Sequence, residues 1–400
     1  MKVIPSLISL LIIALLAQKS LAAVNDTTLQ SFASFPIGAY LSQKNTADTL
    51  YMKRAINEFG SITTGTIKMD NIRPNESEFN FAGTDYWVHF AQKYGKRIHG
   101  HVLIRSGVPD WVLDYEGDSV ALEKLMKEHI QTIIASYKGK INSWDVVNEA
   151  IDDYGNIKTE NIWFRNLGEG YIERAFIYAH EADSEALLFY NDYGHEYSNR
   201  RLDSIVAKIN RYVKKGIPIH GIGMQMHTRY NLGDERWKNA IKYCATTGLK
   251  IHISELDISV NNSPMDPDAI FTQELAITQG EKYRYIVEAY NELPGAQKFG
   301  ITTWGVGDKD TWIRGTYKRP EWPLPFDDKY ERKPAYYGIL EGLGVKLSSS
   351  TKNAIATKEI KEKKYYSLLG VEVDQFFKGA LIEKIIYTDN QSKTNKILNK

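Results

Sequence analysis

The sequence predicts an α/β protein whose main domain is a (β/α)8 TIM barrel, followed by a small β-rich C-terminal tail. Strand-like runs recur between longer helix-like segments, which is typical of repeated β-α units around a parallel sheet. Eight such runs fall within roughly 320 residues, a length that favours a closed barrel. The 400 residues, 43% hydrophobic and 25% charged, have the composition of a globular protein with a large core.

Eight segments carry the strand prediction: Pro36–Leu41, Ser61–Thr63, Arg97–Leu103, Ser143–Val147, Leu187–Tyr190, Gly221–Met224, Lys250–Ile253 and Gly300–Trp304. Helices are expected between them, among others at Tyr51–Glu58, Leu122–Tyr137, Tyr171–Ala182, Arg201–Lys214, Arg236–Thr246 and Gly280–Asn291. An open doubly wound sheet is the structural alternative. No Gly-rich phosphate-binding fingerprint follows the first strand, which argues against a dinucleotide-binding version of that sheet.

The N-terminus has the order of a secretory signal peptide. Met1–Val3 carries a positive charge, Leu7–Ala17 is apolar, and Ser20–Ala22 offers small residues for a peptidase. We therefore expect 1–22 to be a signal peptide and the protein to be secreted or held at the cell surface. A short membrane anchor is the alternative. Cys244 is the single cysteine, so no intramolecular disulfide can form, and we expect its side chain to be buried.

The character of the chain changes after the predicted catalytic domain, 24–345. Serines and a charged stretch predict a linker over 346–364, and strand-like runs separated by glycines predict a β-rich segment over 365–400. The rhythm YxLLGxxV followed by KGxxI resembles the C-terminal sorting domain of proteins that Bacteroidetes-type bacteria export through the type IX secretion system. An ordinary ancillary β-module is an equal alternative.

The charge balance provides no overall attraction for a polyanion. Fifty basic and 49 acidic residues give a net charge of +1, so no global field attracts nucleic acid or an anionic membrane. No second long apolar run follows the N-terminal one, so no membrane span is expected. We expect a neutral partner and a monomer, and the 25 Tyr and 8 Trp residues suit sugar faces as well as cores.

Two carboxylates stand directly after buried strand-like runs. Glu149 follows the fourth predicted strand within WDVVNEA, and Glu255 ends the seventh within KIHISELDI. A carboxylate in such a place faces the barrel mouth or loses its hydration at a high free-energy cost. A helix cap or salt bridge is the commoner role of a lone Glu. A pair on strands four and seven instead favours glycosidic bond cleavage, which with retention needs two carboxyl groups about 5 Å apart.

The segments around these residues resemble glycoside hydrolase family 10, the β-1,4-xylanase family. WDVVNEA, residues 144–150, is similar to the acid/base motif of that family, and ISELDI, residues 253–258, is similar to its nucleophile motif. The resemblance covers about residues 35–342. Further stretches agree in the same order: Gly100–His101, Tyr190–Tyr193, Gly221–His227, Thr303–Gly305, Asp308–Lys309 with Trp312, Pro323–Asp327 and Lys333–Tyr336.

The resemblance implies a retaining mechanism in which Glu149 is the acid/base and Glu255 the nucleophile, without cofactor or metal. Asn148 would donate to the sugar 2-hydroxyl, and His227, oriented by Asp257, would hold Glu255. The other implied site residues are Lys68, His101, Gln225, Trp304, Trp312 and, in support, Tyr193. Core packing is the alternative for the two tryptophans, and a satisfied buried imidazole is the alternative for His227.

The chain departs from the family in two loops that bind the glycone sugars. Residues 62–69 read ITTGTIKM, where the family has a Glu-Asn pair and then Met-Lys, although Lys68 aligns with the family lysine. Residues 104–109 read IRSGVP, where the family has Trp-His and soon a Gln. Loss of groups built for particular hydroxyls puts the exact polysaccharide in doubt. Arg105 could recognise a carboxylate or sulfate, or it could face solvent or pair with Asp110 or Asp114.

The sequence therefore predicts a secreted retaining endo-β-glycanase that cleaves β-1,4-xylan or a related, decorated or charged β-glycan. The alternative is a carbohydrate-binding protein that kept the barrel and lost efficient turnover. The presence of both carboxylates argues against that alternative, because a binding protein needs no acid and nucleophile pair.

Overall fold

The computed structural model describes residues 28–261, 266–348, 360–368, 370–374, 379–387 and 392–399. The chain divides into two compact units, one over Asp26–Lys346 and one that contains the C-terminal segment from Leu347. The predicted signal peptide, 1–22, lies outside the described residues, as do residues 349–359 of the predicted linker.

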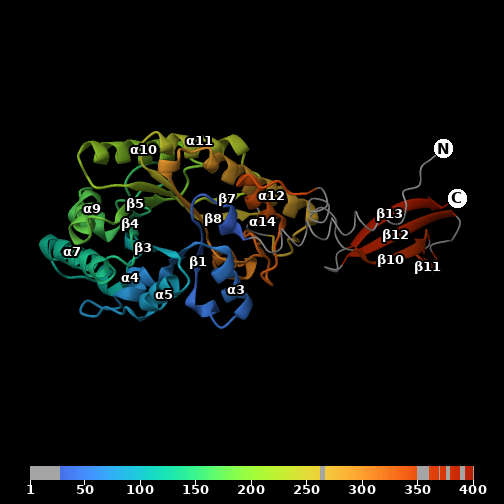
Figure 1. Cartoon of the computed structure of the whole chain (residues 1–400), viewed down its shortest axis with the longest axis horizontal. Helices are drawn as coiled ribbons and strands as arrows, with labels where there is room; N and C mark the ends of the chain where they lie inside the picture. Colours follow the sequence, from blue (N-terminus) through green and yellow to red (C-terminus); the bar gives the residue numbers. More distant parts are fainter. Residues whose placement is uncertain are drawn as a thin grey trace. The chain divides into compact units, whose positions relative to one another are not determined.

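The first unit is a closed barrel of eight parallel strands (Figure 1). The barrel closes because β1 pairs with both β2 and β9, and β6 pairs with β8. A short extra strand, β7 (His227–Arg229), pairs with the end of β8. The barrel strands are β1 (Ile37–Leu41), β2 (Ser61–Thr64), β3 (Arg97–Arg105), β4 (Ser143–Asn148), β5 (Leu187–Asp192), β6 (Gly221–Met224), β8 (Lys250–Ser259) and β9 (Lys298–Thr303).

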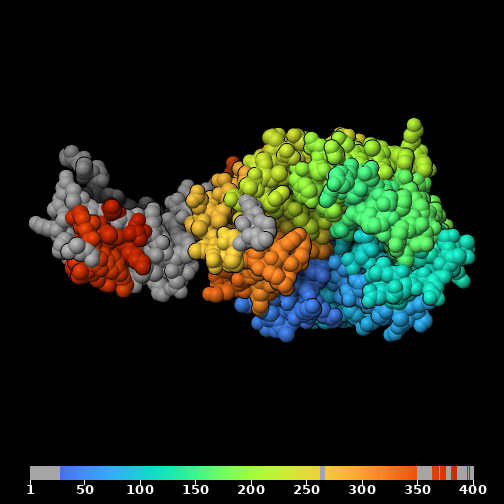
Figure 2. All heavy atoms as spheres, turned by 180° about the vertical axis from the view of Figure 1, so that it is seen from behind, coloured from blue at the N-terminus to red at the C-terminus, as the bar shows by residue number. Residues whose placement is uncertain are grey.

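Helices surround the barrel, and in the space-filling view the segments follow one another around the unit in sequence order, from blue through green to orange (Figure 2). The longer ones are α3 (Thr49–Glu58), α5 (Ala82–Lys93), α7 (Ser119–Ser136), α9 (Tyr171–Ala182), α10 (Asn199–Lys214), α11 (Asp234–Ala245), α12 (Gln273–Asn291) and α14 (Pro334–Gly342). The short ones are α2 (Leu29–Phe32), α4 (Met69–Ile72), α6 (Asp110–Leu113), α8 (Ile162–Leu167) and α13 (Trp312–Tyr317), with 3-10 turns η1 (Gln43–Asn45), η2 (Gly65–Ile67), η3 (Gly295–Gln297) and η4 (Asp308–Asp310).

Side-chain caps fix where several helices begin. Asp48 accepts hydrogen bonds from two backbone amides of α3, and Asp118 accepts one from α7. Such caps satisfy amides that have no partner inside the helix. Thr272 caps α12 in the same way, so this helix begins at Gln273, seven residues before the predicted Gly280.

The predicted barrel of eight strands is confirmed, and five of the strands run further than expected at their C-terminal ends. β5 continues to Asp192 and β8 to Ser259 because the polar residues there stay in the ladder and are buried. The barrel interior holds a cluster of rings in which His99 and His252 lie edge to face at 4.9 Å and both contact Phe299. Cys244 is buried as expected.

The C-terminal unit contains a small antiparallel sheet in the order β11-β10-β12-β13, which confirms the predicted β-rich tail. Its strands are β10 (Ile360–Ser367), β11 (Glu372–Val373), β12 (Gly379–Tyr387) and β13 (Ser392–Asn399). β10 therefore begins inside the segment predicted as linker, 346–364. Among the described residues, no helix is both long and apolar enough to cross a bilayer.

Candidate active site

Polar side chains gather where barrel strands β4, β5, β6 and β8 end. Glu149 directly follows β4 and Gln225 directly follows β6, whereas Glu255 lies within β8. Glu149 has a φ of 56° and Met226, next to Gln225, a φ of 61°. Such left-handed backbone is uncommon for residues other than glycine and persists where surrounding structure holds it. The backbone is thus bent at both points where it presents a site residue.

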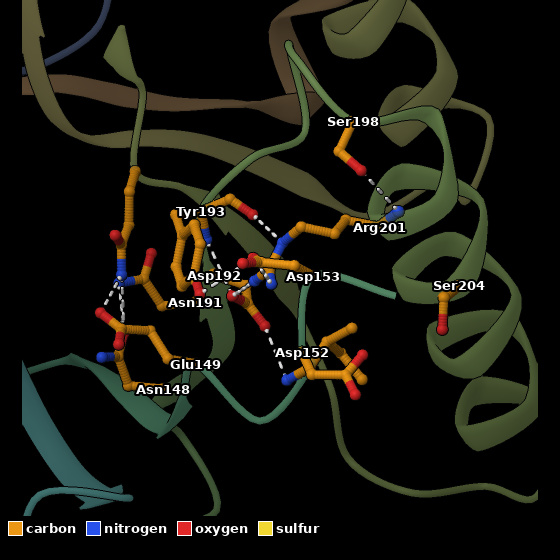
Figure 3. Close-up of polar contacts among 12 residues, drawn as sticks. Asn148, Glu149, Asp152, Asp153, Asn191, Asp192, Tyr193, Ser198, Arg201 and Ser204 are labelled. Carbon is orange, nitrogen blue, oxygen red and sulfur yellow. Dashed lines mark hydrogen bonds and ion pairs between the residues drawn. The ribbon is translucent and has the colours of Figure 1, made fainter. Parts of the chain in front are cut away.

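A chain of hydrogen bonds joins the two carboxylates. The Nδ2 group of Asn191 donates to Oε1 of Glu255 and to Oδ1 of Asn148, both at 2.8 Å. The Nε2 group of Gln225 donates to the same Oδ1 of Asn148 at 3.2 Å and to Oε1 of Glu149 at 3.0 Å. Figure 3 shows Asn148, Glu149 and Asn191 close together at the ends of β4 and β5. Glu149 and Glu255 therefore belong to one polar network.

The network also fixes the direction of the Asn148 amide. Its oxygen accepts from two donors, so its Nδ2 group is the one left to donate. The side chain of Asn191 is held in turn, because Ser254 donates to its Oδ1 at 2.6 Å. Each amide orientation here follows from its neighbours' donors.

Glu255 is buried, 4% exposed, and is held on its second oxygen by His227. Nε2 of His227 lies 3.1 Å from Oε2 of Glu255, and Nδ1 lies 2.9 Å from Oδ2 of Asp257. Trp312 also donates to Oδ2 of Asp257, at 2.9 Å. The structure thus connects four of the predicted residues through successive polar contacts, in the order Trp312, Asp257, His227 and Glu255.

The positive charge of His227 and the negative charges of Asp257 and Glu255 stabilise one another. Burial lowers the pKa of His227, but the charges and hydrogen bonds of Asp257 and Glu255 outweigh burial and raise it well above its usual value. Burial raises the pKa of Glu255, but the His227 hydrogen bond and the positive charges of His101, His227 and Lys68 together hold it below its usual value. Glu255 is therefore ionised beside a protonated imidazole, whereas Glu149 is partly exposed and accepts an amide hydrogen bond.

Aromatic rings and a lysine enclose the space beside Glu255. Trp304, 9% exposed, packs against Tyr40 with ring centroids 4.4 Å apart and against His101 at 5.3 Å. The Nζ atom of Lys68 lies 5.9 Å from the Trp304 ring. His227 contacts Trp304 and Trp312, at 6.0 and 5.1 Å. Both tryptophans therefore contact predicted site residues and do not only pack in the core.

The buried carboxylate of Asp145 holds the imidazole of His101 in place. Its Nδ1 atom lies 2.9 Å from Oδ2 of Asp145, and Nε2 of His99 lies 3.1 Å from the other oxygen of Asp145. Burial raises the pKa of Asp145, but the two imidazoles outweigh burial and hold that pKa well below its usual value. Asp145 on β4 thus orients His101 on β3 toward the ring of Trp304.

Tyr193 and Arg105 lie at the edge of this network. Tyr193 packs against the guanidinium of Arg201, 3.7 Å from its ring, and donates to Asp153 at 3.4 Å (Figure 3). Arg105 is partly exposed and pairs with Asp70 at 2.5 Å. The suggested partners Asp110 and Asp114 are therefore wrong, because Arg105 is turned toward the loop after β2.

Three residues of the network carried no individual role in the sequence prediction. They are Asn191, which bridges two site residues, Tyr40, which packs on Trp304, and Asp145, which holds His101. One signal could have identified Asn191 and Asp145: each is a polar residue that directly adjoins an apolar run, Leu187–Tyr190 for Asn191 and Val146–Val147 for Asp145. Nothing in the sequence marks Tyr40. Within the described part of the chain, no three His, Cys, Asp or Glu side chains group as a metal site.

The sequence profile of "Glycosyl hydrolase family 10" matches residues 24–342. Endo-1,4-beta-xylanase B of Thermotoga neapolitana is 36% identical over 300 residues, 74% of this chain and 84% of that protein. Endo-beta-1,4-xylanase Xyn10C of Cellvibrio japonicus is 34% identical over 82% of this chain, which spans 59% of that longer protein.

A solved structure has the same architecture. Native xylanase 10B from Thermotoga maritima superposes with a TM-score of 0.74 at 32% identity, covering 80% of this chain and 98% of that one. The profile match covers most of the barrel unit and includes every predicted site residue. The chain therefore belongs to glycosyl hydrolase family 10.

Proposed function

We propose that this chain is a retaining endo-β-glycanase that hydrolyses β-1,4-xylan or a related, decorated or charged β-glycan. The observation that carries the proposal is the hydrogen-bond chain between Glu149 and Glu255, two carboxylates with unlike surroundings. Retaining cleavage requires such a difference, because one group must give a proton while the other attacks as an anion. Membership in family 10 and the xylanase relatives support xylan as the leading substrate.

In the first step, Glu255 is the nucleophile. Its carboxylate attacks the anomeric carbon, the bond to the leaving oxygen breaks, and Glu149 gives its proton to that oxygen. The buried, ionised state of Glu255 and its hydrogen bond from His227 suit this role. The amide of Asn148 is free to donate to the sugar 2-hydroxyl, a contact that strengthens as positive charge develops on the ring.

In the second step, water replaces the enzyme oxygen. Glu149, now ionised, takes a proton from the water, the water oxygen bonds to the anomeric carbon, and the ester bond to Glu255 breaks. Each displacement inverts the carbon, so the two together retain its configuration. Gln225, which donates to Glu149, helps to hold that carboxyl in place through both steps.

The remaining predicted residues shape the sugar site. Trp304 and Trp312 supply apolar walls for the sugar faces, and Lys68 and His101 supply donors beside Glu255. Tyr193, which donates a hydrogen bond to Asp153 in the loop after β4, offers a further aromatic ring at the edge of the network. These positions support binding of a polymer across the carboxylate pair.

We further propose that the protein is exported and acts as a monomer outside the cell. The charged, apolar and small residues of 1–22 support a signal peptide. The antiparallel sheet over Ile360–Asn399, with the YxLLGxxV rhythm at its start, is compatible with a type IX sorting domain and with an ancillary β-module. Export of a reporter fused to 360–400, in a host with and without that secretion system, separates the two.

The substrate is tested by incubating the purified protein with unsubstituted β-1,4-xylan, β-1,4-glucan and uronate-bearing or sulfated β-glycans, with products read by mass. Release of oligosaccharides with a new reducing end from xylan or a substituted xylan is expected. Glu255→Ala is expected to abolish that release. Binding without release from any polymer would contradict the proposal and would favour a carbohydrate-binding protein.

A further inference from the structure

A pocket with a volume of about 680 Å³ opens beside the candidate active site, between the loops that follow β1 and β2. This volume lies within the range of small-ligand sites, roughly 300–1,000 Å³. Tyr40 and Lys68 line the pocket and also contact Trp304. The negative charge of Glu255 acts on the pKa of both Tyr40 and Lys68, so the pocket lies next to the candidate catalytic carboxylates.

Small side chains keep this pocket open. Its lining includes the run Thr64–Gly65–Thr66 and the first turn of α5, with Gly83. A Cβ atom at Gly65 would lie 2.5 Å from the hydroxyl of Tyr40, and one at Gly83 would lie 3.0 Å from Thr66. The absence of side chains at these two glycines therefore lets the walls pack closely without filling the space between the loops.

The charged side chains that line the pocket are all positive. Of the residues that line it, Lys44 and Lys68 alone are charged, and no carboxylate is among them. Neither lysine forms an ion pair with any carboxylate in the described parts of the chain. The nearby acids are already engaged, since Asp70 pairs with Arg105 and Asp48 pairs with Lys309.

Several neutral polar groups of the pocket are engaged as well. Asn71 donates to the carbonyl of Gly65 at 2.8 Å, and Asn80 accepts from the amide of Ala82 at 3.2 Å. Thr66 is within hydrogen-bonding distance of Thr84, at 3.1 Å. The two ammonium groups are the charged donors that this pocket presents to a ligand.

The ammonium of Lys68 is partly buried and forms no ion pair in the described parts of the chain, and the charge of Glu255 offsets its loss of hydration only in part. Burial lowers the pKa of Lys68, and the nearby Arg105 lowers it further, against the opposing effect of Glu255. A bound anion would offset that loss of hydration. A lysine binds carboxylates and sulfates as a point charge and does not require one fixed orientation. This tolerance suits an acidic group carried on a side branch of a polymer.

We propose that this pocket, through Lys44 and Lys68, binds an anionic substituent of the β-glycan, a uronic acid carboxylate or a sulfate ester. The inference rests on the proposed function and adds a specificity site to it. It also reassigns recognition of the acid from Arg105, whose guanidinium is paired with Asp70, to the two unpaired lysines.

The test compares three polymers of matched length: a uronate-bearing β-1,4-xylan, the same polymer after its carboxylates are reduced to alcohols, and a sulfated β-1,4-xylan. The wild-type protein is expected to show a higher kcat/KM on at least one anionic polymer than on the reduced one. The anionic polymer that is preferred identifies the group. Raising the salt concentration should weaken the preference, because charge attraction at an open site is screened.

Lys44→Gln is expected to lower the ratio of kcat/KM on the preferred anionic polymer to that on the reduced polymer by about fivefold, the size typical of an exposed charge pair. Lys53→Gln is the matched control, since Lys53 lies on the exposed face of α3 and does not line the pocket. It removes the same charge and should leave that ratio unchanged.

Equal kcat/KM on all three polymers, or an equal ratio in Lys44→Gln and wild type, would overturn the inference and leave the proposed function standing. Cleavage of none of the three, nor of unsubstituted xylan, would overturn the proposed function and the inference with it.

Discussion

Nε2 of His227 lies 3.1 Å from Oε2 of Glu255, and this contact couples the proton of the imidazole to the charge of the carboxylate. The protonated His227 stabilises ionised Glu255, and Asp257 on the far side of the ring keeps that proton bound. A buried carboxylate without such a partner would have a raised pKa and would be a poor nucleophile. The reactivity of Glu255 therefore depends on the protonation of a neighbouring residue.

Replacing His227 by Asn removes this support. The pKa of Glu255 rises, so the acidic limb of the profile of kcat/KM against pH moves to higher pH, and activity falls about 10- to 100-fold at neutral pH. The profile measured on an aryl β-xyloside checks the shift. His89→Asn, on the exposed face of α5, is the control and should keep the wild-type limb. A lower rate with an unmoved acidic limb would contradict this coupling.

The side-chain amide of Asn191 donates hydrogen bonds both to Glu255 and to Asn148, which lies next to Glu149 in the chain. Asn191→Ala leaves Glu255 without its donor on Oε1 and frees the Asn148 amide to turn. We expect kcat on an aryl β-xyloside to fall about 10²-fold, as for the loss of one preorganised donor in an active site. An unchanged thermal midpoint would show that the fold survives. Activity within about twofold of wild type would contradict the bridging role.

Arg201 is predicted to be the strongest single polar support of the loops after β4 and β5. Its fully buried guanidinium pairs with Asp192 at 2.5 Å and with Asp153 at 3.1 Å. Arg201→Met leaves the carboxylate of Asp192 buried and unpaired, which costs about 3–5 kcal/mol of the free energy of unfolding. Urea denaturation measures this loss.

The neighbouring exposed Arg200 provides the control for that measurement. Arg200→Met should change the free energy of unfolding by no more than about 0.5 kcal/mol. Equal stability of the two variants would show that the buried pair contributes little.

Acid should destabilise the fold in part through His129. Burial, and then the charge of Arg73, lower its pKa to about 3, and its Nε2 atom lies 3.1 Å from the carbonyl oxygen of Leu103. The unfolded chain binds this proton below about pH 6.5 and the folded chain does not until about pH 3. Stability contributed by His129 is thus present above pH 6.5 and is lost as the pH falls toward 3, by about 1.4 kcal/mol per pH unit.

His129→Gln removes the titrating group and keeps a donor for Leu103. The decline in the free energy of unfolding between pH 6.5 and pH 4 should become shallower by about that slope, as denaturant midpoints at several pH values would reveal. His89→Gln, at an exposed position, should keep the wild-type slope. If the free energy of unfolding of both variants declines as steeply as that of the wild type, protonation of His129 does not contribute to the loss of stability in acid.

The sequence predicted the eight strands from their hydrophobic runs, and its short motifs marked Glu149, Glu255 and several of the residues around them as candidates. It did not predict that β8 continues through Glu255 to Ser259, because the polar residues there looked like the end of a strand. Likewise, the Asp70 partner of Arg105 depends on how the loop after β2 folds back, and 35 residues separate the two in the chain. An ion pair between residues this far apart in the chain produces no local sequence pattern from which it could be predicted.

The relation between the two carboxylates is tested most directly by azide rescue with analysis of the product's configuration. In Glu255→Ala, azide can enter where the carboxylate stood, and an α-glycosyl azide is expected from a β-aryl glycoside. In Glu149→Ala, azide attacks the anomeric carbon of the glycosyl ester from the face opposite Glu255, the bond to the Glu255 oxygen breaks, and a β-glycosyl azide is predicted. Rescue of both variants to the same anomer, or undiminished activity in either without azide, would contradict the assignment of nucleophile and acid/base.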